Sequence, residues 1–156
     1  MSLTRALETK IPPPLVALII LAAMWFMADK LPRLDLPTSA RIIATGFVAI
    51  LGLSFIVAGI LSFRKAQTTV NPLKPDQASA LVTVGVFRCT RNPMYVGLLL
   101  ILAAYAIFLS SPAALAGPVA FVVYIDRFQI APEERVLEAK FGSVYVDYKH
   151  RVRRWL

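Results

Sequence analysis

Four long apolar runs dominate this sequence and constrain its fold more than any other feature. They cover about residues 14–28, 39–63, 93–109 and 113–128. Hydrophobic residues make up 58% of the chain and charged residues only 17%, which is too apolar for an ordinary soluble domain. Because roughly 20 apolar helical residues cross a bilayer core about 30 Å thick, we expect about four transmembrane helices in a single membrane domain, 1–156.

Glycine and proline positions indicate how these helices begin, end and pack. Gly52 and Gly59 lie on nearly the same face of the second helix, so we expect a close approach to another helix there. Pro93 is placed to start the third helix. After Pro132 the tail 129–156 is typical of an interfacial helix that Gly142 interrupts. The predicted fold is an all-α integral membrane protein with about four transmembrane helices and a C-terminal interfacial helix.

The basic residues are distributed unevenly between the two sides of the predicted topology. The formal net charge is +8. The N-terminus, the long loop 64–92 and the segment from Arg127 onward carry fourteen Lys and Arg residues, and the first loop carries three. The positive-inside rule therefore predicts that both termini and the long loop are cytoplasmic. Since the basic residues lie at the ends of apolar runs, membrane lipids are the expected partners and nucleic acid is not.

The sequence offers little material for metal or triad chemistry. Cys89 is the only cysteine and His150 the only histidine. A zinc site or a Ser-His-Asp triad is therefore not expected.

The first polar motif is RNPMY at residues 91–95, where the long loop meets the third helix. Free N–H groups and the helix dipole favour an anion at such a junction, beside Arg91 and Asn92. Gly85 and Phe87, slightly earlier, suit a close backbone approach to a planar ligand. The alternative is that Arg91 only reaches lipid phosphates and Tyr95 belongs to an interfacial aromatic belt.

The second polar motif is the acidic pair Glu133 and Glu134, which follows the fourth apolar run. These carboxylates could bind a ligand ammonium or sulfonium, or pair with Arg127, Arg135 or Arg91. Charges such as Arg127 are costly at the end of an apolar helix unless they are paired or exposed at the interface.

Taken together, the motifs carry a family resemblance. LVTVGVFRCTRNPMYVG (81–97), a helical hairpin and EERVLEAKFGSVYVDYKHRV (133–152) follow in that order. This arrangement resembles the isoprenylcysteine carboxyl methyltransferase and phospholipid methyltransferase family, integral membrane enzymes that use S-adenosylmethionine. The likeness covers about residues 68–155.

The resemblance implies cofactor contacts in three separated segments, and Asn92 stands where the family often has histidine. Asparagine cannot titrate, which argues against a histidine-type proton relay at this position. The cofactor-binding residues implied by the resemblance are Ala80, Leu81, Val82, Phe87, Asn92, Pro93, Met94, Tyr95 and Glu133. Reasoning from the residues themselves adds Gly85, Arg91 and Tyr145.

The expected reaction is methyl transfer from S-adenosylmethionine to a lipidic or amphipathic carboxylate, thiol or amine that enters from the bilayer. Glu134 is the first candidate to accept a proton from an amine. The resemblance also implies an arginine that contacts the acceptor, and Arg127 is the candidate for it. An NADPH-dependent reductase of the steroid-reductase type is an alternative, because Arg88, Arg91 and the tail arginines could bind its extra phosphate. A small structural or transport protein is a further alternative.

Overall fold

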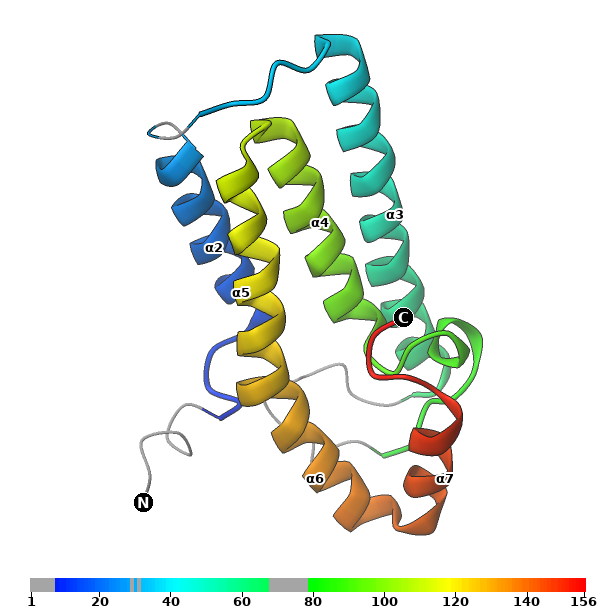
Figure 1. The fold of residues 1–156 in the computed structure, drawn as a ribbon. Coiled ribbons are helices and arrows are strands. Elements are labelled where there is room, and N and C mark those ends of the chain that lie inside the picture. Colours follow the sequence, from blue (N-terminus) through cyan, green and yellow to red (C-terminus); the bar gives the residue numbers. More distant parts are fainter. Residues whose placement is uncertain (1–7, 29, 31, 68–78) are drawn as a thin grey trace.

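The structure is a computed structural model that describes residues 8–28, 30, 32–67 and 79–156. Helices are the only regular secondary structure in these residues (Figure 1). The helices are α2 (Pro13–Ala28), α3 (Thr38–Lys65), α4 (Pro93–Leu109), α5 (Ala116–Ile125), α6 (Ala131–Phe141) and α7 (Ser143–Arg151). The short segments are η2 (Gly85–Arg88), η3 (Pro112–Leu115) and the π-helical η4 (Asp126–Ile130). The predicted all-α fold is confirmed for the described chain. Residues 68–78 of the expected cofactor loop lie outside it.

Four helices run side by side in alternating directions, and α4 lies at the centre of the bundle (Figure 1). It packs against α3, α2 and α5. The helix Thr38–Lys65 and the continuous helix Pro112–Phe141 are long and apolar enough to cross a membrane, and α2 and α4 are shorter apolar helices. Large apolar side chains of α3, such as Ile43 and Phe47, are exposed, as expected for a surface covered by lipid.

Glycines bring α3 and α4 together. Gly52 and Gly59 are the only buried residues of α3. A Cβ atom at Gly52 would lie 2.8 Å from the carbonyl oxygen of Gly97, and one at Gly59 would lie 2.9 Å from Met94 Cγ. The predicted close approach through these two glycines is therefore confirmed. Gly97 on α4 completes the contact, while Gly46 faces open space.

The fourth apolar helix continues beyond its expected end at Phe128. It runs through η4 into α6 without a break, so the expected interfacial helix after Pro132 is not a separate element. In η4 the backbone N–H of Ala131 donates to the carbonyl of Asp126, which is the wider π pattern. Pro132 has no N–H to donate, and the wider turn removes the usual conflict between a proline and the preceding carbonyls. Gly142, at φ +55°, ends this helix as predicted.

Candidate functional site

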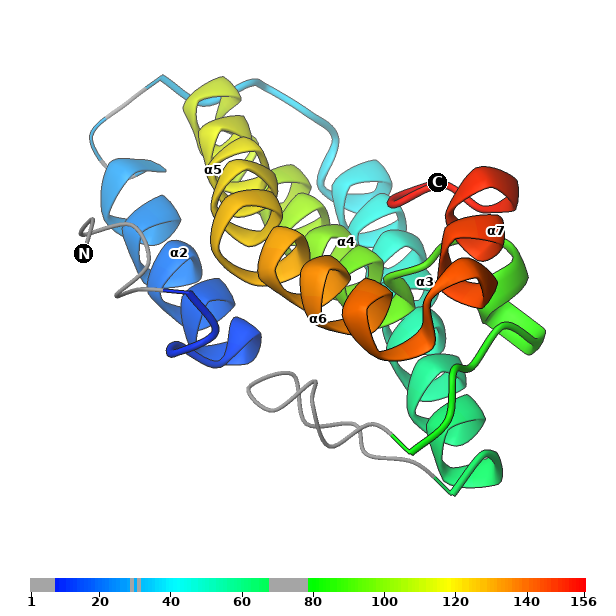
Figure 2. The ribbon, with the colours of Figure 1, turned by 90° about the horizontal axis from the view of Figure 1, so that it is seen from below.

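The two polar motifs meet at the lower end of the bundle, where α4 begins and α6 passes it (Figures 1 and 2). The hydroxyl of Tyr95 donates to Glu133 Oε1 at 2.8 Å, and Gln129 Nε2 donates to the same oxygen at 3.0 Å. Within the described residues no ion pair reaches Glu133. This carboxyl group is therefore held in place by a phenol and an amide, with no basic side chain of the described residues paired to it.

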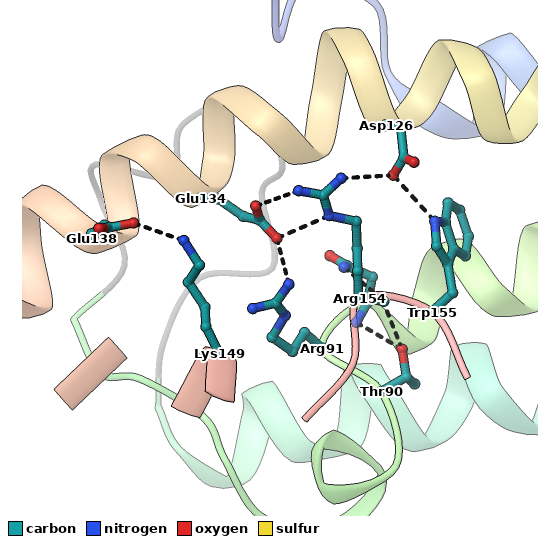
Figure 3. A network of polar contacts seen from close by, with 9 residues as sticks. Thr90, Arg91, Asp126, Glu134, Glu138, Lys149, Arg154 and Trp155 are labelled. Atoms are coloured by element: carbon teal, nitrogen blue, oxygen red, sulfur yellow. Dashed lines mark hydrogen bonds and ion pairs between the residues drawn. The ribbon is translucent and has the colours of Figure 1, made fainter. Parts of the chain in front are cut away.

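Glu134, the next residue, has the opposite environment (Figure 3). Arg91 Nη2 donates to its Oε1 at 2.8 Å. Arg154 donates to both oxygens, from Nε at 3.1 Å and from Nη2 at 2.6 Å. The Glu134 side chain is only 11% exposed. Charge-assisted hydrogen bonds from two guanidinium groups thus stabilise a nearly buried carboxylate.

Arg154 reaches Glu134 because the tail folds back over the start of α4. The backbone N–H of Arg91 donates to the carbonyl of Arg153 at 3.0 Å. The carbonyl of Arg154 accepts from Thr90 Oγ1 at 3.1 Å and from Asn92 Nδ2 at 2.9 Å. The Asn92 side chain therefore holds the tail, which gives it a structural role that does not require titration.

A second anchor fixes the tail to the π segment (Figure 3). Trp155 Nε1 donates to Asp126 Oδ1 at 3.1 Å, and Arg154 Nη1 lies 3.5 Å from the same oxygen. The tail thus joins the loop before α4 to two separate turns of the η4–α6 helix.

Arg91 carries hydrogen-bonding capacity that the described residues do not use. Its side chain is 10% exposed. Nη2 binds Glu134, while Nε and Nη1 are buried and have no hydrogen-bond partner among the described residues. Because buried donors without acceptors are costly, these two nitrogens indicate an anionic group that the described part of the chain does not supply.

The loop before α4 is fixed by aromatic side chains. The buried Phe87 ring meets Phe63 of α3 edge to face, with centroids 5.2 Å apart. The hydroxyl of Tyr148 donates to the carbonyl of Phe87 at 2.7 Å, which places α7 beside η2. Burial raises the pKa of Tyr148 to about 12, so its phenol stays a hydrogen-bond donor at neutral pH. Burial also raises the pKa of Tyr145, whose ring lies 6.3 Å from that of Tyr148.

Five of the predicted site residues are joined by these contacts, directly or through the tail. They are Arg91, Asn92, Tyr95, Glu133 and Glu134. Phe87 and Tyr145 belong to the adjoining loop and α7, and Gly85 takes the left-handed conformation, φ +65°.

Other predicted residues have different surroundings. Pro93 and Met94 pack against Gly59, so they serve the helix contact. Val82 is buried, and Ala80 and Leu81 are partly buried in the loop. Arg127 is half exposed, pairs with Glu8 at 3.6 Å and lies over the ring of Phe128. The structure does not bring Arg127 into contact with the acidic pair.

The sequence reasoning missed five residues of this network: Thr90, Asp126, Gln129, Arg154 and Trp155. Gln129 could have been found, because it lies four residues before Glu133 on one helix face. Arg154 gave no such signal, since it sits in a basic tail and reaches Glu134 only through the folded chain.

The site has the charges of a receptor for a zwitterion. Among the residues that the structure describes, Glu133 offers a carboxyl group without a cationic partner, and Arg91 offers two nitrogen donors without an acceptor. These residues therefore fit an amino-acid-like cofactor with a carboxylate and a positive centre. No group of three or more His, Cys, Asp or Glu side chains that could hold a metal ion occurs in the described ranges.

Comparison with known proteins gives a family model and several relatives. A model of the phospholipid methyltransferase family matches residues 40–144 of the 156. The protein-S-isoprenylcysteine O-methyltransferases B and A of Arabidopsis thaliana are 31% and 32% identical over 111 and 98 residues. These alignments cover 65% and 61% of this chain, and 55% and 48% of the plant enzymes, so the chain spans about half the length of either.

A third relative covers a shorter part of the chain. An uncharacterised protein of Haemophilus influenzae is 51% identical over 63 residues, which are 40% of this chain and the whole of that protein. No solved structure gives a significant match.

Proposed function

This chain belongs to the phospholipid methyltransferase family, and on that premise we propose that it is a membrane enzyme that transfers a methyl group from S-adenosylmethionine to a lipidic or amphipathic acceptor. The plant relatives are named as methyltransferases of isoprenylcysteine, which supports a lipid-modified acceptor. Four membrane passes, with the site on the cytoplasmic side, are part of the proposal. The four apolar helices and the fourteen basic residues at one end support this orientation.

The observation that carries the proposal is the complementary charge of Glu133 and Arg91. We assign the two free N–H groups of Arg91 to the carboxylate of the methyl donor. We assign Glu133 to its positive centre, either ammonium or sulfonium, with Tyr95 and Gln129 fixing the carboxylate. S-adenosylmethionine supplies an electrophilic methyl group when bound. The protein's task is then chiefly to align donor and acceptor and to exclude water.

We assign different roles to the two glutamates. Glu134 already accepts hydrogen bonds from two guanidinium groups, so it fits a positioning role for Arg91 better than the expected role of base. An amine acceptor would require a proton acceptor, and Glu133, which has no cationic partner among the described residues, is better suited to that role. A carboxylate or thiolate acceptor requires no base. Arg127 stays a proposed acceptor contact, and an anionic acceptor would compete with Glu8 for it.

Calorimetry on the purified full chain tests the donor. We expect S-adenosylmethionine and S-adenosylhomocysteine to bind, and NADPH not to bind. Arg91→Gln and Glu133→Gln should each weaken binding of S-adenosylmethionine about tenfold or more, the loss expected for one charge-assisted interaction. Arg88→Gln, which alters an exposed arginine three residues before Arg91, is the matched control. Binding of NADPH alone would point to the reductase class and overturn the proposal.

Methyl transfer tests the acceptor class. Full-length protein is incubated with tritiated methyl donor and either prenylated cysteine, phosphatidylethanolamine or free fatty acid. Label in one lipid fraction that is lost in Glu133→Gln would identify the acceptor chemistry. Binding of S-adenosylmethionine without methyl transfer to any of these lipids would count against the proposed methyltransferase activity.

A further inference from the structure

A concave surface lies at the other end of the bundle from the candidate site. It has a volume of about 600 Å³, within the roughly 300–1,000 Å³ typical of ligand sites. Leu21 and Trp25 of α2, Thr45 and Ala49 of α3, and Ala104 and Phe108 of α4 line it. We call this surface the α2–α3–α4 groove. Its lining residues come from α2, α3 and α4, whose arrangement is drawn in Figure 1.

The lining of the groove is almost entirely apolar, and its polar groups are concentrated at one end. Arg41 precedes Thr45 by four residues on α3, so both side chains lie on the same helix face. The Arg41 guanidinium carbon lies 5.8 Å from the centroid of the Phe108 ring, which lines the groove. The Arg41 cation therefore lies at the end of the groove that is near the start of α3.

Both polar side chains have unused hydrogen-bonding capacity. Arg41 Nε and Thr45 Oγ1 are buried, and neither has a hydrogen-bond partner among the described residues. Other hydroxyls of α3 behave differently: Ser54 and Ser62 each donate at 2.8 Å to the carbonyl four residues earlier. Thr45 leaves this local bond unmade, although it is available to a helical threonine.

We propose that the α2–α3–α4 groove binds one acyl chain of an anionic phospholipid, whose phosphate is held by Arg41 and Thr45. The apolar lining suits a hydrocarbon chain, and the exposed apolar surface of α3 shows that this side of the bundle faces lipid. A phosphate accepts hydrogen bonds from a guanidinium and a hydroxyl together, which would satisfy both unpartnered groups. The site is separate from the Glu133–Arg91 site and does not depend on methyl transfer.

Native mass spectrometry of the full chain in detergent tests this site. Phosphatidylglycerol and phosphatidylcholine with identical acyl chains are offered at equal concentration. We expect one phosphatidylglycerol to be retained in preference to phosphatidylcholine. Arg41→Gln should lower that retention about tenfold, the loss expected for a charge-assisted contact, and Thr45→Val should lower it less. Ala49→Phe, which fills the groove from α3, should lower retention of both lipids.

Arg33→Gln is the matched control, because this exposed arginine lies in the loop before α3. An equal loss in Arg33→Gln would show general charge attraction and overturn the site. Equal retention of the two lipids, or full retention by Arg41→Gln with an unchanged circular dichroism spectrum, would also overturn it. If inorganic phosphate displaced phosphatidylglycerol as effectively as a second phospholipid does, the groove would not bind an acyl chain.

Discussion

Glu133 and Glu134 are consecutive on one helix, and the turn of about 100° between them sends their side chains to different neighbours. Glu134 is enclosed by Arg91 and Arg154, and Glu133 by Tyr95 and Gln129. One carboxylate is therefore part of the scaffold, and the other keeps a charge available to a ligand. This difference leads to separate predictions for two substitutions of the same kind.

Glu134→Gln should destabilise the protein by at least about 2 kcal/mol, because it leaves the nearly buried Arg91 guanidinium without its anion and leaves Arg154 with Asp126 alone. Thermal unfolding of the detergent-solubilised protein measures this. Glu138→Gln is the control: it removes an ion pair with Lys149 in which the Glu138 side chain is 46% exposed. That loss should stay below about 1 kcal/mol. Equal losses of stability in the two variants would mean that the Arg91–Glu134–Arg154 cluster stabilises the protein no more than an exposed ion pair does.

Arg154→Gln should weaken the affinity for S-adenosylmethionine about tenfold, although Arg154 is assigned no contact with it. The reason is that Arg154 holds Glu134, which in turn holds Arg91. Arg154→Lys keeps the charge but loses the bidentate hydrogen bonds to Glu134, and it should recover only part of the affinity for S-adenosylmethionine. Calorimetry measures both variants. Full affinity in Arg154→Gln would remove Arg154 from the positioning role.

At the scale of helices, the contact between α3 and α4 depends on residues without side chains. Gly52, Gly59 and Gly97 line this contact, whereas large α3 side chains such as Ile43 and Phe47 are exposed. The sequence predicted Gly52 and Gly59 from their spacing. It could not single out Gly97, because that glycine also belongs to the conspicuous polar motif that ends in YVG.

Gly97→Ala should therefore be strongly destabilising. An added Cβ would overlap Ile56 and lie 2.6 Å from the carbonyl oxygen of Gly52, so α3 and α4 would have to separate. The matched control is Gly46→Ala in the same bundle, where nothing lies within 4 Å and alanine is the better helix former. Unfolding temperatures should fall by several degrees for Gly97→Ala and hold or rise for Gly46→Ala. A similar response in both would refute close glycine packing.

The helices could be predicted from the sequence, but the connections between them were harder to predict. The apolar runs predicted the four apolar helices of the bundle, since hydrocarbon requires long helical segments. We expected a new helix after Pro132. Instead, the wider π-helical turn η4 accommodates the proline, and the helix continues into α6. The two polar motifs were recognised from residue types, whereas Thr90 and Arg154 come together only through tertiary folding across 64 positions.

At the scale of the whole molecule, the bundle has a polar end with the candidate site and an opposite end with the groove. Cys89, the only cysteine, is exposed near the polar end, in the loop before α4. Four passes with cytoplasmic termini would make this thiol reachable from one side only.

An impermeant maleimide should therefore label Cys89 in inside-out vesicles and not in intact spheroplasts. A variant with Cys89→Ser and Arg33→Cys should show the reverse, because residue 33 lies in the loop at the other end of the bundle. Labelling of both positions from the same side would contradict the four-pass topology.

The unbroken helix Pro112–Phe141 has a mechanical consequence. Its 30 residues span about 45 Å, longer than a hydrocarbon core of about 30 Å, and Glu133 lies beyond its apolar part. A long helix adjusts to a thinner bilayer by tilting. Tilt about the packed middle of this helix would swing Glu133 away from Tyr95, which begins a different helix. Lipid tail length would thus set the gap between the two residues, and turnover would respond to the thickness of the host membrane.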